Sequence, residues 1–168
     1  ADFVFNIHAA QTPCQTISAE HLDLSQPIVP QIHADPFTGN RYLRLRAFPG
    51  ELRLSYAATV DLAHHRAEPA SLAEVPVHRI PPDVLGYIYP SRYCQSDQLS
   101  RLAWDLVGDI ENPHEKVVAI SDWIHDNVEY LSGSTDSRTS AYDTVTQRTG
   151  VCRDFSHLAI ALSRAVNI

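Results

Sequence analysis

The sequence predicts an α+β protein in which an N-terminal antiparallel β-domain is followed by a mainly helical part. Two changes of pattern along the chain support this. In the first third, apolar residues alternate with polar ones, as in strands that bury one face. After a stretch without either period that contains Pro69 and Pro76, apolar residues recur at helical spacing. We therefore predict a β-domain over residues 1–65, a linker over 66–80 and the helical part over 81–168.

The β-domain is predicted from alternating runs of apolar and polar residues. Residues 3–7 are interpreted as one strand and residues 16–24 as a weaker one. The clearest signal is a pair of runs, 43–47 and 52–62, on either side of Pro49-Gly50. Two period-two runs joined by a Pro-Gly turn are typical of an antiparallel hairpin. We therefore expect these two strands to pair with each other.

Two helices are expected early in the helical part. Asp97 can cap the first of them, and Gly108 would end it. The second begins at Asn112, a capping residue that precedes Pro113 at the first helical position and Glu115 in the first turn. The residues expected to face the core are Leu99, Leu102, Ala103, Leu106 and Val107 on the first helix, and Val117, Ile120, Ile124 and Val128 on the second.

Two more helices are expected near the end of the chain. Ser140 with Asp143 is a variant of the capping box and predicts a short helix to about residue 148, which Thr149-Gly150 would end. The last helix begins near Cys152 and runs to the C-terminus. Its apolar face would be formed by Phe155, Leu158, Ala159, Leu162 and Val166.

Charge and composition exclude several classes of partner. The chain has a net charge of −7 with neutral histidines, and Lys116 is its single lysine, so it lacks the basic surface that binding to nucleic acid or an anionic membrane requires. No apolar run reaches the length of a membrane span. His64, His65 and His78 have no thiolate or carboxylate at ligand spacing, so neither a metal nor another cofactor is expected.

The chain contains three scattered cysteines, Cys14, Cys94 and Cys152, which form neither a disulfide pattern nor a CxxC motif. This usage is typical of a reducing compartment, and we expect a cytoplasmic protein.

Cys152 lies in the one segment whose pattern indicates chemistry, because a glycine turn precedes it and an apolar helix follows it. The thiolate is the nucleophilic form of cysteine, and a helix N-terminus stabilises it through unpaired N–H groups and the helix dipole. The same N–H groups can hold the oxyanion of a tetrahedral intermediate. Val151, Arg153 and Asp154 would support this helix start. Asp154, on the far side of the helix from Cys152, would do so electrostatically.

A packing role for Cys152 accounts for the same spacing. The thiol falls on the helical stripe of Phe155 and Ala159, and a free cysteine behaves as a small hydrophobe. A cysteine nucleophile also needs a base, usually histidine. His157 is about 140° around the helix from Cys152, and nothing in the sequence aims the histidines of the preceding helix at the thiol. The residues alone leave both roles open.

Residues 150–158, Gly-Val-Cys-Arg-Asp-Phe-Ser-His-Leu, resemble the nucleophile motif of the bacterial transglutaminase-like superfamily, which includes transglutaminase-related cysteine peptidases. The resemblance implies that Cys152 is the catalytic nucleophile and that the helical part is the first half of a papain-like, transglutaminase-like core. It extends, with decreasing specificity, to residues 161–165, 124–130, 140–143, 87–97 and 42–56, and so covers nearly the whole chain.

The resemblance implies a Cys–His–Asp triad in which the His and Asp follow the Cys along the chain. Only the Cys maps onto this sequence, so we expect a chain that is truncated after the nucleophile helix and inactive by itself. The intact protein would be a cysteine peptidase or amidase, or a transglutaminase, acting on a peptide or protein amide. The alternative is a noncatalytic protein-interaction module with an inert core cysteine at position 152.

Truncation would also affect association. The apolar face of Phe155, Leu158, Ala159 and Leu162 would lose part of its cover. Because an exposed apolar stripe promotes association, we expect a homodimer formed through this face.

Overall fold

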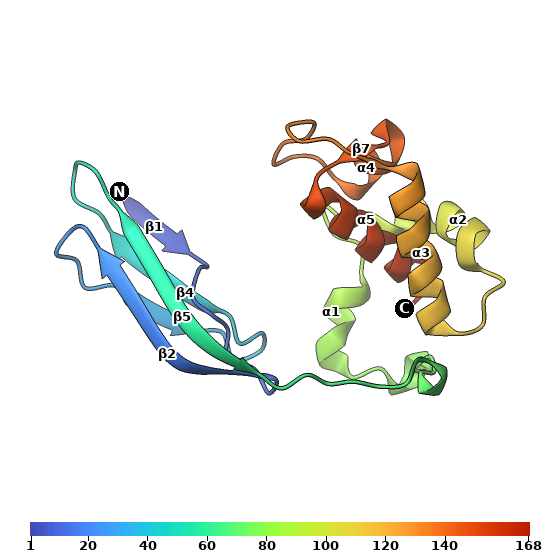
Figure 1. Ribbon diagram of the computed structural model, residues 1–168, viewed down its shortest axis with the longest axis horizontal. Coiled ribbons are helices and arrows are strands. Elements are labelled where there is room, and N and C mark those ends of the chain that lie inside the picture. Colours follow the sequence, from blue (N-terminus) through green and yellow to red (C-terminus); the bar gives the residue numbers. More distant parts are fainter. The chain divides into compact units, whose positions relative to one another are not determined.

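The computed structural model describes residues 1–168 and divides into two compact units, which we treat separately (Figure 1). The first, Ala1–Arg66, contains only strands, and we refer to it as the β-unit. The second, Ala67–Ile168, contains every helix, and we refer to it as the helical unit. The α+β class expected from the sequence is confirmed.

The β-unit consists of two antiparallel sheets. One has the strand order β1-β4-β3 and the other pairs β2 with β5. The two sheets share one apolar cluster, in which buried residues of β4 contact leucines of β2 and β5. The bounds of the strands are β1 Asp2–Phe5, β2 Gln15–Leu24, β3 Gln31–Ala34, β4 Arg41–Arg46 and β5 Leu54–Leu62.

The hairpin expected around Pro49-Gly50 is wrong, although both of its strands exist. Leu43 of β4 is opposite Phe5 of β1 and Ile32 of β3, so both edges of β4 are occupied. β5 pairs instead with β2, the strand that the sequence indicated only weakly. The Pro-Gly segment therefore carries the chain from one sheet to the other.

Gln26, just after β2, fastens this crossing segment. Its side-chain amide donates to the carbonyl of Glu51 at 2.9 Å, and its side-chain oxygen accepts the N–H of Phe48 at 2.9 Å. The segment that crosses between the sheets is therefore held at the end of β2, which pairs with β5, the strand that the segment leads into.

A polar contact joins the two sheets at another place. Arg41 of β4 donates two hydrogen bonds, of 2.7 and 2.8 Å, to the carboxylate of Glu20 on β2. The hydroxyl of Tyr56 on β5 donates to the same carboxylate at 2.9 Å. The hydrogen bonds from Arg41, in first place, lower the pKa of Glu20 to about 2.

The helical unit begins with a segment of short helices, and this segment includes the expected linker. It contains η1 (Pro69–Ser71), η2 (Val77–Arg79), η3 (Pro82–Val84) and α1 (Leu85–Ile88). Between η1 and η2, the carboxylate of Glu74 forms an ion pair of 2.6 Å with the ammonium group of Lys116. Only 6% of Lys116 is exposed, so this pair fastens the segment to the helix that carries the lysine.

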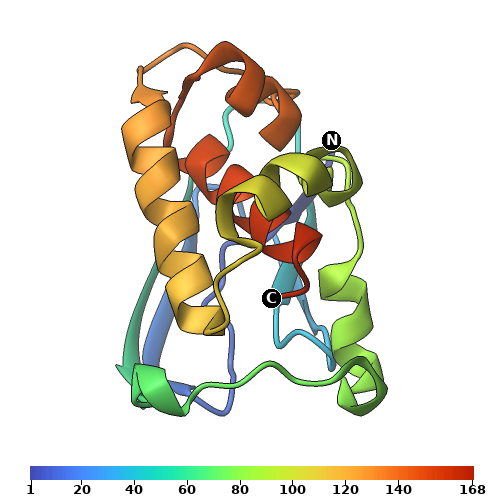
Figure 2. The same ribbon diagram turned by 90° about the vertical axis from the view of Figure 1, so that its right-hand side faces the viewer.

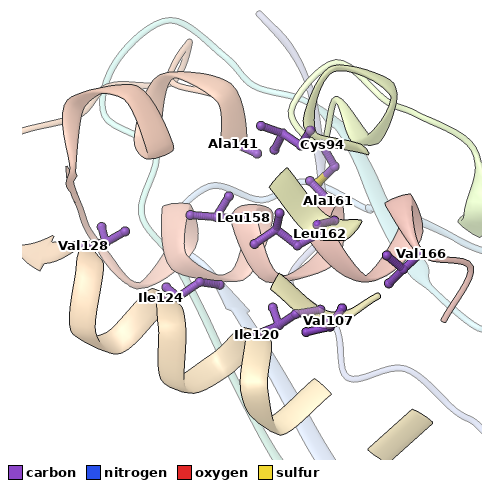
Figure 3. Packing of buried hydrophobic residues seen from close by; sticks show 12 residues of the cluster. Cys94, Val107, Ile120, Ile124, Val128, Ala141, Leu158, Ala161, Leu162 and Val166 are labelled. Carbon is purple, nitrogen blue, oxygen red and sulfur yellow. The ribbon is translucent and has the colours of Figure 1, made fainter. Parts of the chain in front are cut away.

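Four longer helices form the core of the helical unit, and α5 contacts each of the other three (Figure 2). Figure 3 shows the apolar side chains that gather around α5. Leu158, Ala161 and Leu162 of α5 are completely buried. The bounds of these helices are α2 Ser96–Val107, α3 Pro113–Asn127, α4 Ala141–Gln147 and α5 Cys152–Ala165. None of the helices combines the length and apolar composition that a membrane crossing requires.

Most of the expected helix starts are confirmed. The side chain of Asn112 accepts the N–H groups of His114 and Glu115 at the start of α3. Ser140 and Asp143 form a reciprocal capping box at α4. Asp97, in contrast, lies inside the first turn of α2, and Gln95 precedes that helix without a side-chain cap.

The expected apolar faces need two corrections. Val117 is 43% exposed, and its neighbour Lys116 takes the buried position through the long apolar part of its side chain. On α5, Ala161 is buried and was not expected. Phe155 and Ala159, like Leu102 and Leu106 of α2, are half-buried and pack against the core as expected.

The homodimer was expected because two leucines of α5 would be partly exposed, and the structure contradicts that exposure. Leu158 and Leu162 were expected to be partly uncovered, but both are completely buried against the other helices of the same unit. The core cluster of the helical unit thus covers them without a partner, and the structure does not support association through this face.

Candidate active site

Cys152 is the first residue of α5 and is exposed. Val151 before it is extended, with φ −113° and ψ 175°, so the helix begins abruptly at the cysteine. The thiol is therefore not packed on the apolar stripe of the helix, and the interpretation of Cys152 as a core cysteine is wrong. Among the other cysteines, Cys14 is exposed and Cys94 is buried.

The start of α5 has two unused hydrogen-bond donors. The N–H groups of Asp154 and Phe155 both donate to the carbonyl of Val151, at 2.8 and 3.1 Å. Those of Cys152 and Arg153 donate to no group of the chain. Two free amides thus lie in the same turn as the exposed thiol, where the positive end of the helix dipole also acts.

Gly150 does not form the turn that the sequence suggests. It is an extended residue of β7 (Thr149–Gly150), which pairs in parallel with β6 (Glu129–Tyr130). The residue with left-handed conformation is Arg148, with φ 59°, at the end of α4.

Close packing explains the glycine at position 150. A Cβ atom there would lie 3.0 Å from the Cβ of Asp154 and 3.3 Å from a methyl group of Thr144. Both neighbours are completely buried, so neither can move aside easily. Gly150 thus lets the strand before Cys152 approach α4 and the first turn of α5.

Asp154 is completely buried and lies at the centre of a polar network. Its Oδ2 accepts the hydroxyl of Thr135 at 2.6 Å and the N–H of Val151 at 3.0 Å. Its Oδ1 accepts the Nε and Nη2 of Arg153 at 3.0 and 2.7 Å. Burial by itself would raise the pKa of Asp154, but these hydrogen bonds and the charge of Arg153 outweigh it, so the pKa is lowered.

Arg153 connects this network to the loop between β6 and α4. Its Nη2 donates to the carbonyl of Asp136 at 2.7 Å and to the hydroxyl of Thr135 at 3.3 Å. The guanidinium is therefore fixed between the loop and the carboxylate of Asp154. Val151, Arg153 and Asp154 thus make one connected set with the loop, whereas the Cys152 side chain has no hydrogen bond to it.

None of the nine histidines forms a hydrogen bond with Cys152. His157 stacks on Tyr93, with ring centroids 5.3 Å apart, and its buried Nδ1 has no partner. Burial, and then the charge of Arg153, lower the pKa of His157.

His125 has a different position. Together with Ser121 and Ile124 of α3, it lines an open hollow whose other side is formed by Phe155, Ser156 and Ala159 of α5. Phe155 and Ser156 lie one helical turn from Cys152, on the same side of α5. The sequence gave no signal for this placement because it depends on how α3 and α5 pack.

Comparisons with known proteins agree with this architecture. The family model of the bacterial transglutaminase N-terminal domain matches residues 1–83, and that of the transglutaminase-like superfamily core matches residues 100–168. A crystal structure of a candidate cysteine protease from Cytophaga hutchinsonii is 47% identical, with a TM-score of 0.86, and the match covers 98% of this chain and 57% of that one. An uncharacterized protein of Mycobacterium leprae (strain TN) is 36% identical over 56 residues, which are 33% of this chain and 20% of that protein.

The chain thus spans little more than half of the similar crystal structure and a fifth of the Mycobacterium protein. Its two family matches follow the two structural units, since the first includes the whole β-unit and the second includes α5 with Cys152. The chain therefore belongs to the transglutaminase-like superfamily, with a bacterial transglutaminase N-terminal domain before the core.

Proposed function

We propose that this chain supplies the nucleophile of a cysteine peptidase or amidase that acts on a peptide or protein amide. The observation that carries the proposal is the exposed Cys152 at the first position of α5, beside two amides with no partner. A thiolate at such a position is favoured by the helix dipole, and the site lies open to a substrate. The similarity to a candidate cysteine protease supports the same reaction class.

In the proposed reaction, the sulfur of Cys152 attacks the carbonyl carbon of the amide. A C–S bond forms, and the carbonyl oxygen becomes an oxyanion that accepts a hydrogen bond from the free N–H of Cys152. A base takes the thiol proton and then gives it to the amine that leaves, so a thioester remains. Water as the acceptor completes hydrolysis, and an amine as the acceptor gives transglutaminase chemistry.

The base is the part of this reaction that residues 1–168 do not place beside the sulfur. The transglutaminase-like pattern has a His and then an Asp after the Cys in chain order. We propose that these two residues belong to a segment outside residues 1–168, and that residues 1–168 by themselves do not turn over substrate.

Alkylation by iodoacetamide at neutral pH tests the nucleophile directly. Cys14 is a matched control, because it is also exposed but lies outside any helix, and Cys94 is a buried control. We expect Cys152 to react fastest and Cys94 slowest, as measured by mass spectrometry of the peptides. Equal rates for Cys152 and Cys14 would contradict a thiol activated by the helix start.

Turnover provides the second test. In the full-length protein, hydrolysis of a peptide amide should disappear in the C152A variant, with folding checked by circular dichroism. Turnover by residues 1–168 that is lost in C152A would show that the base lies within them, and His125 would then be the first residue to replace.

A further inference from the structure

The first turn of α5 contains a carboxylate that is favourable for the helix and unfavourable for the proposed nucleophile. An acidic side chain at a helix N-terminus stabilises the helix through its dipole. The same negative charge disfavours a thiolate two residues away. Asp154 is in this position, completely buried and in its charged form.

Arg153 resolves this conflict in the structure. Its guanidinium donates twice to Oδ1 of Asp154, and the loop holds it there through the carbonyl of Asp136. Oδ2 is already bonded by Thr135 and by the N–H of Val151, so anchoring of the helix start does not need the arginine. What Arg153 adds is a compensating positive charge next to Cys152.

We propose that Arg153 and Asp154 form a charge-balanced positioning pair, in which Asp154 anchors the start of α5 and Arg153 cancels its charge at Cys152. The inference rests on the proposed role of Cys152 as nucleophile. Neither residue touches the reacting atoms, so both act through the cysteine. The loop that carries Thr135 and Asp136 is part of the arrangement because it holds the guanidinium in place.

The other titratable groups around the pair have partners of their own or are neutral. Asp136 and Arg138 of the loop pair with each other at 3.0 Å. The carboxylate of Asp143 on α4 accepts hydrogen bonds from the N–H and the hydroxyl of Ser140. His157 follows on the next turn of α5, and its lowered pKa keeps it uncharged at neutral pH. Arg153 is therefore the cation that balances Asp154.

The test measures the alkylation rate of Cys152 by iodoacetamide at pH 7 in R153Q, in R153K and in the double variant R153Q/D154N. Cys14 in the same sample is the internal standard. We expect R153Q to lower the rate of Cys152 about two- to threefold, as for one unit charge on a neighbouring exposed group that bulk water screens. R153K should restore most of the rate because it keeps the charge. R153Q/D154N should also restore it because it removes both charges.

Two results would overturn the pair. One is equal loss in R153Q and R153K, which would mean that guanidinium geometry and not charge matters. The other is a rate in R153Q/D154N below that of R153Q, as expected if the two residues only hold the fold. If the double variant does not fold, as judged by circular dichroism, the comparison of R153Q with R153K decides by itself.

Failure of this inference is distinguishable from failure of the proposed function. Alkylation needs only the thiolate, so a charge effect on its rate can appear even if no amide is cleaved. Conversely, peptide turnover that needs Cys152 but is the same in R153Q as in the wild type would leave the function intact and exclude the pair.

Discussion

Replacing Gly150 with alanine tests whether close packing just before α5 constrains this position. The new methyl group would lie 3.0 Å from the Cβ of Asp154 and 3.3 Å from a methyl carbon of Thr144, both completely buried. Overpacking of a rigid interior costs about 1–3 kcal/mol, and the loss of glycine freedom in the unfolded chain returns about 0.4–1 kcal/mol. We expect G150A to lower the free energy of unfolding by about 1–2 kcal/mol.

Urea unfolding followed by tryptophan fluorescence measures this change in the relevant part of the molecule. Trp104 and Trp123 are the only tryptophans, and both lie in the helical unit. A thermal scan should show a Tm lower by about 5–10 °C for a unit of this size.

Gly86→Ala is the matched control. Gly86 lies in α1, and a Cβ atom there would meet nothing within 4 Å. G86A should therefore be as stable as the wild type or slightly more stable. If G150A unfolds at the same urea concentration as the wild type, the packing argument for position 150 is refuted.

Three further predictions concern contacts that stabilise each unit from within. N112A should lower the stability of the helical unit by about 1 kcal/mol, measured by tryptophan fluorescence, because two N–H groups of α3 lose their acceptor. The pKa of Glu20 is lowered to about 2 from 4.5, so its bonds to Arg41 stabilise the β-unit above pH 4.5 and lose this effect as the pH falls toward 2. Unfolding followed by circular dichroism should show that the stability of E20Q depends less on pH over this range. E74Q should destabilise the helical unit by about 1 kcal/mol because it leaves the ammonium group of Lys116 buried without a counter-charge. K116M should change the stability by less than about half that amount. A larger loss in K116M than in E74Q would contradict this prediction.

Features that depend on a few neighbouring residues could be predicted from the sequence. Asn112 before Pro113, and Ser140 with Asp143, define helix starts through side chains that bond amides two or three positions away. The position of Cys152 at the start of α5 has the same local character. In each case the short stretch of sequence contains the whole interaction.

The partner of a strand could not be predicted in this way. The alternating patterns of β4 and β5 correctly identified two strands, but their pairing with β1 and β2 depends on residues 30–47 positions away. The strand β3 gave no signal because all four of its residues are exposed. A short exposed edge strand has no buried alternation from which it could be recognised.

The candidate site shows the same division. The position of Cys152 at a helix start is predictable from local pattern. The network of Asp154 is not, since Thr135 lies 19 residues earlier in a loop without periodicity. The reason for glycine at position 150 was also hidden. A left-handed turn and a close approach both favour glycine, and only the structure shows that the turn is at Arg148 and the close approach at Gly150.

The buried position of Lys116 has a consequence for a protein of this superfamily. Within residues 1–168 the one lysine is 6% exposed and bound to Glu74, and the amino group of Ala1 donates to the carbonyl of Ala47 at 2.9 Å. In this folded state these residues therefore offer no accessible lysine to which an acyl group could be attached.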